Sequence, residues 1–310
     1  MYRAQLRWQP IAILLILALI WGANMAIVKI GARELPPLFM AGFRSLVASI
    51  CLYLWMKTNR MVIFPTKSIL FHGIVVGLMF GIEFGLIYTA LGYSPASRVY
   101  IFVYTAPFFT AFGAHFLLQG DRLNLWKTSG LVLAFTGVVV LFMGGLSSYS
   151  LSSLPGDIMS LISAALWGLT TVYVKKYLAY RTVPLQTLFY QLFFSTPLLL
   201  VVSIALENHV FPGLSLATWF SIFYQCFIVA FLSYLVWFEL IHRYPVSLLH
   251  AFSFFTPVFG VFLSGALILG EVINPSLIAA LILVSIGMVL VNFQPPDKAS
   301  KEEKRGQVCS

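Results

Sequence analysis

The sequence predicts an all-α integral membrane protein with ten transmembrane helices, arranged as two inverted five-helix repeats. Three observations predict this fold class. Of the 310 residues, 60% are hydrophobic and only 9% are charged, whereas a soluble domain carries about 25% charged residues. The apolar residues form runs of about 20, the length that crosses a bilayer. Landmarks of the first half of the chain recur in the second half.

The predicted spans follow one another through short polar connections, so no soluble domain fits between them. The polar stretch 295–310 is expected to be a disordered cytoplasmic tail. The boundaries of the repeats are expected at 1–146 and 147–294. The ten spans are expected at 11–30, 37–56, 69–91, 97–118, 125–144, 156–177, 184–206, 216–241, 246–269 and 275–293.

The positive charges indicate how the chain lies in the membrane. The net charge is +9, but the basic residues lie in short gaps between apolar runs rather than on one folded basic face, which argues against nucleic acid as a partner. Fifteen of the 19 Lys and Arg fall on one side, three (Lys29, Arg33 and Arg98) on the other, and Arg44 lies inside a span. The positive-inside rule therefore predicts a multi-pass protein of the cytoplasmic (inner) membrane with both termini in the cytoplasm.

An internal duplication relates the two halves of the chain. Trp21, Gly22 and Lys29 recur 146 residues later as Trp167, Gly168 and Lys175. Pro95, Pro107, Gly120-Asp121 and Gly137 recur 150 residues later as Pro245, Pro257, Gly270-Glu271 and Gly287. Because each repeat has five spans, an odd number, the second must cross the membrane in the opposite sense. Inverted repeats of this kind are typical of secondary transporters, although receptors and scaffolds also contain repeats.

The sequence gives no support for an enzyme. It contains no HExxH, no GxSxG and no phosphate-binding GxxxxGK[ST] motif. Cys51, Cys226 and Cys309 are scattered without the spacing of a metal site or a disulfide framework. We therefore expect no catalytic residues, no metal and no cofactor.

Several motifs together resemble the EamA family of the drug/metabolite transporter superfamily, over all ten spans. They are Trp21-Gly22-Ala23-Asn24, Arg44 after Pro36-Pro37, Pro107, Pro257, Gly120-Asp121 and Gly270-Glu271. The resemblance implies a ten-helix fold around a central cavity, with the fifth and tenth spans at the periphery. It also implies transport of amino acids, other small metabolites or toxic compounds, commonly outward and driven by protons.

We therefore expect a secondary transporter that moves a small metabolite, an amino acid or a related amphiphilic solute, by proton-coupled export. Uptake or exchange by the same fold is the alternative in mechanism, and a membrane receptor or scaffold is the alternative in class. The expected partners are the small-molecule substrate, protons and the lipid bilayer. The protein is expected to act as a monomer or homodimer.

Two charges inside the spans require an explanation, because a centred charge costs about 2.5–3.5 kcal/mol on insertion scales. Arg44 and Glu83 lie at similar depths on neighbouring spans, roughly 10–12 Å below the outer surface, which suggests an ion pair. Glu83 is the candidate proton carrier, and Arg44 is a candidate to bind a substrate carboxylate. The alternative is that Arg44 is a structural charge or snorkels outward.

Aromatic and hydrogen-bonding residues complete the predicted site. Asn24 follows Trp21 by three residues, and Thr170 and Thr171 follow Trp167 by three and four, so each half presents both groups on one helix face. Helix packing would explain the same spacing. His115, Glu239, His242 and His250 are read as interfacial groups or gate hydrogen bonds. The remaining candidates for the cavity wall are Tyr88, Tyr104, Tyr190, Gln191 and Trp237; of these, Gln191 occupies the place in the second repeat that Arg44 holds in the first.

Overall fold

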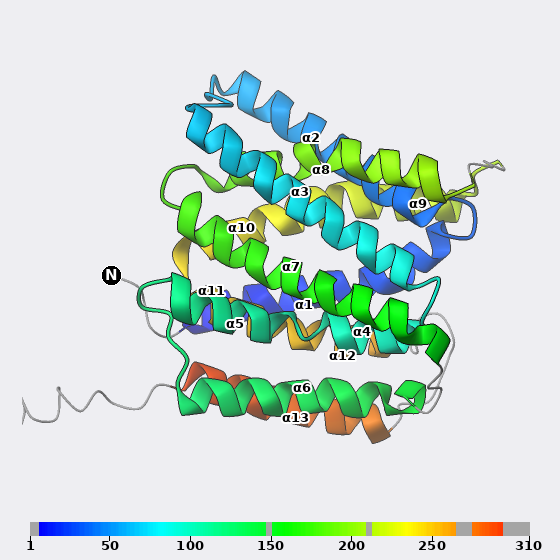
Figure 1. Ribbon diagram of the computed structural model, residues 1–310, viewed down its shortest axis with the longest axis vertical. Coiled ribbons are helices and arrows are strands. Elements are labelled where there is room, and N and C mark those ends of the chain that lie inside the picture. The colour runs from blue at the N-terminus through cyan, green and yellow to red at the C-terminus, as the bar shows by residue number, and fades with distance from the viewer. Residues whose placement is uncertain (1–5, 147–150, 209–212, 265–274, 294–310) are drawn as a thin grey trace, which may run out of the picture.

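The computed structural model describes residues 6–146, 151–208, 213–264 and 275–293, and the regular elements within these ranges are helices joined by short connections (Figure 1). They contain ten candidate membrane spans, as the sequence predicted. Gly270, Glu271 and the tail 295–310 lie outside the described residues. The helices are α1 (Trp8–Gly31), α2 (Pro37–Thr58), α3 (Lys67–Ala90), α4 (Ala96–Val103), α5 (Ala106–Leu117), α6 (Leu125–Leu146), η1 (Leu151–Ser153), α7 (Leu154–Tyr177), α8 (Pro184–Leu206), α9 (Leu216–Phe223), η2 (Tyr224–Ser233), α10 (Tyr234–Arg243), α11 (Val246–Ala251), η3 (Phe252–Phe254), α12 (Phe255–Ser264) and α13 (Pro275–Asn292).

Two of the spans are broken at equivalent places. The fourth consists of α4 and α5, and Pro107 lies in the first turn of α5. The ninth consists of α11, a 3₁₀ turn and α12, and Pro257 lies in the first turn of α12. Since proline cannot donate a backbone hydrogen bond to the residue four positions earlier, each proline interrupts its helix near the middle of the membrane. The eighth span runs from α9 to α10 through the π-helix η2.

The helix contacts repeat with the two halves exchanged. A Cβ atom added at Gly22 of α1 would lie 2.7 Å from the backbone nitrogen of Gly260 in α12. A Cβ atom added at Gly168 of α7 would lie 2.8 Å from the backbone nitrogen of Thr110 in α5. Gly168 is the repeat equivalent of Gly22, and Gly260 that of Thr110. Each half therefore packs one glycine-containing helix on the broken helix of the other half, which is the arrangement of an inverted repeat.

The fifth and tenth spans, α6 and α13, lie together at one edge of the molecule (Figure 1), as the family resemblance implied. Their backbones meet where Gly130 faces Gly287: a Cβ atom on Gly130 would lie 2.5 Å from the Gly287 carbonyl oxygen. Small residues allow this close approach between membrane helices.

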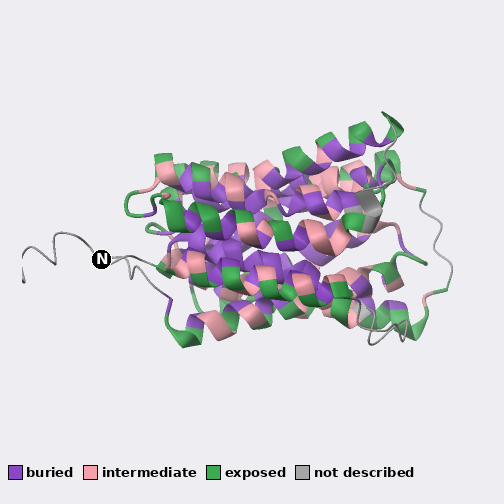
Figure 2. Cartoon of the chain, turned by 90° about the horizontal axis from the view of Figure 1, so that it is seen from below, coloured by how far each residue is buried: buried purple, intermediate pink, exposed green. Residues whose placement is uncertain are grey.

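The two described ends of the chain lie side by side, because the backbone N–H of Leu6 donates to Oδ1 of Asn292 at 3.2 Å. We call this end of the bundle the terminal end and the opposite one the mouth end, since the cavity described below opens there. Buried residues run along the centre of the bundle (Figure 2). Large exposed side chains on the helix surfaces are apolar, for example Phe116, Ile204 and Val289. This surface is suited to lipid.

We expect Gly130→Ala to lower the free energy of unfolding by about 1–3 kcal/mol, because the added methyl group must push α6 away from α13. Thermal unfolding in detergent would measure the loss. Gly85→Ala is the matched control, since a Cβ atom at Gly85 meets nothing within 4 Å. Equal melting temperatures for the two variants would contradict the close helix contact.

Candidate functional site

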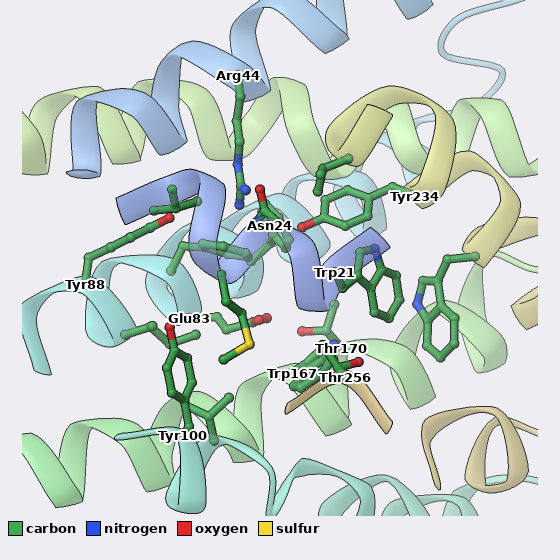
Figure 3. A pocket seen from close by; sticks show the side chains of 18 of the residues that line it. Trp21, Asn24, Arg44, Glu83, Tyr88, Tyr100, Trp167, Thr170, Tyr234 and Thr256 are labelled. Carbon is green, nitrogen blue, oxygen red and sulfur yellow. The ribbon is translucent and has the colours of Figure 1, made fainter. Parts of the chain in front are cut away.

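A cavity of about 360 Å³ lies between the two halves of the bundle (Figure 3). Its rim includes Lys29 and Ala32, which are exposed, and Leu91, which is 37% exposed. Its deepest lining residues, Val174 and Ile241, are only 1% exposed. The cavity therefore opens at the mouth end and stops before it reaches the terminal end.

Aromatic side chains from both halves form the walls, and their positions are fixed. The indole Nε1 of Trp21 donates to Oγ of Ser233 at 2.9 Å, at the end of the π-helix. The Trp21 ring stands edge-on to Trp237, with ring centres 5.3 Å apart. Trp167, the repeat equivalent of Trp21, stands edge-on to Tyr104 at 6.3 Å. The walls thus offer rigid ring surfaces to an apolar part of a ligand.

Arg44 reaches into the cavity from α2 and is only 2% exposed. Its guanidinium carbon lies 4.6 Å from the centre of the Phe84 ring, a cation–π contact. The group points towards Asn24 and the hydroxyl of Tyr234 (Figure 3). Its Nε and Nη2 atoms have no hydrogen-bond partner in the described structure, so two donors remain available to a ligand.

Glu83 lines the cavity from α3 and is 3% exposed, with Oε2 lacking a hydrogen-bond partner. The ion pair expected between Glu83 and Arg44 is not formed in the described structure, although both residues line the same cavity. Arg44 and Glu83 lie at similar depths on neighbouring helices, but the guanidinium of Arg44 packs on the Phe84 ring instead of pairing with Glu83. The two opposite charges are therefore separate features of the wall.

Most of the buried side-chain N and O atoms without a partner, within the described part of the chain, belong to residues of this cavity, among them Asn24, Arg44 and Glu83. Leaving a buried polar atom unsatisfied costs about 1–3 kcal/mol. Buried polar atoms in proteins are normally satisfied by protein or ordered water. Their concentration here indicates a site that a polar ligand or water fills.

The structure places almost all of the predicted site residues on this cavity. They are Trp21, Asn24, Arg44, Glu83, Tyr88, Tyr104, Trp167, Thr171, Gln191 and Trp237. Tyr190 is the exception: its ring stacks on Phe64 with centres 5.6 Å apart, and its hydroxyl donates to the carbonyl of Ile63. Neighbouring residues of a helix point about 100° apart, so Gln191 faces the cavity and Tyr190 faces away from it.

Sequence reasoning did not identify Phe84, Tyr100 and Thr256 as cavity residues. The first two could have been found from helix periodicity. Phe84 precedes Tyr88 by four residues, and Tyr100 precedes Tyr104 by four, and residues four apart share a helix face. Thr256 gave no signal beyond its place before Pro257.

His250 lies below the cavity and is completely buried, which corrects its expected interfacial position. Its Nδ1 lies 2.9 Å from the hydroxyl of Thr110, and its Nε2 lies 3.1 Å from the hydroxyl of Thr171. The imidazole also contacts the ring of Trp167, with centres 4.8 Å apart. His250 of α11 therefore connects to α5 and α7 and packs against the ring of Trp167.

Two buried carboxylates hold the starts of the broken helices. At the mouth end, Asp157 of α7 forms an ion pair with Arg98 of α4 and accepts from Ser94. At the terminal end, Asp121 forms an ion pair with Lys127 at 2.9 Å and accepts from the backbone N–H of Ser247 at 3.0 Å, in the first turn of α11. Each carboxylate belongs to one half and holds the broken helix of the other. Both clusters are therefore scaffolding for the cavity.

The mouth is also braced across the two halves. The carboxylate of Glu34, in the loop before α2, accepts the backbone N–H of Ser215 at 2.8 Å. Hydrogen bonds from Thr218 and Ser215 lower the pKa of Glu34 below its usual value. A carboxylate with a lowered pKa stabilises the folded state above its unfolded pKa, and this contribution is lost as the pH falls through the lowered value. Strong acid would therefore release this brace.

A family comparison agrees with this architecture. The model of the EamA-like transporter family matches residues 8–143 and again residues 154–293. The chain belongs to the EamA-like transporter family. As an EamA protein it is a multi-pass membrane transporter of a small molecule and not an enzyme, and the receptor or scaffold alternative no longer applies.

Two distant relatives of this EamA protein span most of its length. The Bacillus subtilis protein named "Uncharacterized transporter YoaV" is 26% identical, with 89% of this chain and 94% of that protein covered. A Salmonella typhimurium protein named "Probable amino-acid metabolite efflux pump" is also 26% identical, with 90% and 93% covered. A crystal structure titled "Crystal structure of protein" is 19% identical with a TM-score of 0.75, and covers 90% of this chain and 96% of its own. It supports the fold alone.

We expect Arg98→Met to cost about 3–5 kcal/mol of folding stability, because it leaves the Asp157 carboxylate buried without a counter-charge. Adding Asp157→Asn should recover part of this loss, since the unpaired charge is removed. Thermal unfolding of the single and double variants measures the difference. The control is Arg243→Met, which removes the exposed ion pair with Glu239 and should cost at most about 1 kcal/mol. A double variant no more stable than Arg98→Met would contradict the role given to the buried charge.

Proposed function

We propose that this EamA protein exports a small amphiphilic metabolite, an amino acid or a close relative, in exchange for protons. One observation supports this proposal most. The cavity between the inverted halves is open at one end, and it is lined by Arg44 and Glu83, whose side chains have atoms without hydrogen-bond partners. Such a site at the repeat interface is where secondary transporters bind their substrates. Two relatives, each named "Probable amino-acid metabolite efflux pump", support the proposal.

The cavity chemistry supports a zwitterion. The guanidinium of Arg44 suits a carboxylate, because charged hydrogen bonds to planar carboxylates are strong and directional. The carboxylate of Glu83 suits an ammonium group, and the rings of Trp21 and Trp167 suit an apolar side chain. A cavity of about 360 Å³ lies within the usual size range of small-molecule sites. In the second repeat, Gln191 stands at the position equivalent to Arg44, so the cavity has one arginine rather than two. This favours a substrate with one carboxylate over a substrate with two.

The orientation follows from the charge distribution. With both termini in the cytoplasm, the terminal end faces inward and the mouth end faces outward. In this orientation, a cavity open at the mouth end corresponds to an outward-open state in the cytoplasmic membrane. A relative from Escherichia coli that covers about half of this chain is named as an inner membrane transporter, which agrees with this location.

Glu83 gives a means of coupling. A carboxylate that binds an ammonium group cannot at the same time bind a proton there, so substrate and proton compete for one oxygen pair. In the outward-open state Glu83 releases the substrate and takes up an external proton. In the inward-open state it gives the proton to the cytoplasm and binds the next substrate. Competition at one carboxylate is sufficient for exchange, and the inward proton gradient drives export.

Substrate class is tested by reconstitution into liposomes with labelled amino acids and the corresponding amines that lack the carboxylate. We expect transport of apolar and aromatic amino acids, and at least tenfold less transport of the amines, because the amines do not pair with Arg44. Arg44→Gln should lower amino-acid transport to a similar degree, whereas Arg243→Gln, an exposed arginine outside the cavity, should not. Equal transport of acids and amines by the unaltered protein would overturn the zwitterion assignment.

Proton coupling is tested with Glu83→Gln in the same liposomes. We expect the variant to lose accumulation driven by an imposed pH gradient and to lose the pH dependence of its rate, because a glutamine amide cannot carry a proton. Glu239→Gln, at an exposed glutamate, is the matched control and should behave like the unaltered protein. A Glu83→Gln variant with unchanged pH dependence would exclude Glu83 as the proton carrier.

A further inference from the structure

Lys175 closes the terminal end beneath the cavity. Its side chain is almost completely buried, and the residue is 1% exposed. Its Nζ donates to the carbonyl of Ile241 at 2.5 Å and to the carbonyl of His242 at 3.1 Å. These carbonyls lie in the last turn of α10, where the helix leaves acceptors unsatisfied and a cation is favourable. Lys175 thus joins the end of α7 to the end of α10.

The first half contains an equivalent lysine and equivalent backbone carbonyls at the mouth end. Lys29, at the end of α1, is the equivalent of Lys175 at an offset of 146 residues. The equivalents of Ile241 and His242, at an offset of 150, are Leu91 and Gly92 after the last turn of α3.

The backbone confirms this register in the two halves. The N–H of Tyr244 donates to the carbonyl of Leu240 at 2.8 Å, and the N–H of Ser94, its equivalent, donates to the carbonyl of Ala90 at 2.9 Å. The two chain segments are therefore in register at this point, although α3 ends at Ala90 and α10 continues to Arg243.

The two lysines are in different states. Lys29 is exposed and lines the mouth of the cavity, and Leu91 lines the same mouth. In the described structure no hydrogen bond or ion pair is made by the Lys29 side chain. At the open end the lysine and the carbonyls are separate, and at the closed end they are joined.

We propose that Lys29 and Lys175 are reciprocal gate residues of the transport cycle. When the mouth closes, Lys29 donates to the carbonyls of Leu91 and Gly92, while Lys175 leaves those of Ile241 and His242 and the terminal end opens. The inference rests on the alternating access of the proposed function, in which inverted repeats exchange their conformations. It goes beyond that function because it assigns one latch, a lysine that donates to helix-end carbonyls, to each state of the cycle.

The test measures the two ends of the molecule separately. Spin labels would be placed on Arg33 and Tyr93 to report the mouth, and on Lys176 and Arg243 to report the terminal end; all four residues are exposed. Cys51, Cys226 and Cys309 would first be replaced by serine. Distances between labels would be measured by double electron–electron resonance in lipid nanodiscs, without substrate.

Identical substitutions at the two lysines should act in opposite directions. Lys175→Met should move the population about tenfold towards a closed mouth and an open terminal end, because one charged hydrogen-bonded group is lost from the outward-open state alone. Lys29→Met should move it about tenfold the other way. The double variant should return towards the starting distribution, and Lys175→Arg should retain most of the latch.

Controls keep the result interpretable. Lys57→Met removes an exposed lysine outside the cavity and should leave both distances unchanged. Elution as a monodisperse species and an unchanged helical spectrum would show that each variant is folded. Shifts in the same direction for the two lysine variants, or no shift for Lys29→Met, would overturn the proposal. Failure of amino-acid transport in liposomes would instead overturn the proposed substrate, because the distances are measured without any solute.

Discussion

The structure depends on one constraint: a polar group within the hydrocarbon must be satisfied from inside the protein, because no water is available. Helices satisfy the backbone, and the buried charges outside the cavity follow the same rule. Asp157 meets Arg98, Asp121 meets Lys127 and Lys175 meets helix-end carbonyls. Within the described part of the chain, the rule is relaxed mainly in the cavity, where atoms of Arg44 and Glu83 are unsatisfied.

In the proposed transport cycle, the inverted repeat lets one constraint serve two conformations. Each half presents a glycine on an intact helix, a helix broken at a proline and a lysine near a helix end, and the glycine contacts of the two halves correspond. Lys175 is engaged while Lys29 is exposed, so equivalent sequence elements are found in different states at the two ends. Under the proposed function, the difference between Arg44 and Gln191 belongs to the binding site, and the symmetry of Lys29 and Lys175 belongs to the gates.

Much of the site was accessible from the sequence because a charge or an aromatic face inside a span has few explanations. Arg44, Glu83, Trp21 and Trp167 were identified on that ground, and all four line the cavity. Tyr190 was misplaced because it is adjacent to Gln191, and adjacency in sequence does not imply a shared helix face. Phe84 and Tyr100 were missed although their spacing to Tyr88 and Tyr104 gave the signal.

The sequence by itself determined the ten spans, the equivalent positions of Pro107 and Pro257 and the inverted relation of the halves. These features follow from apolar length, from a constant offset along the chain and from an odd number of crossings, all of which are local or countable. Only the tertiary structure decided that Arg44 packs on Phe84 rather than on Glu83, that His250 is buried beneath the cavity, and which end is open. Those outcomes depend on rotamers and helix rotations that bring together residues from different spans, and no spacing along the chain records them.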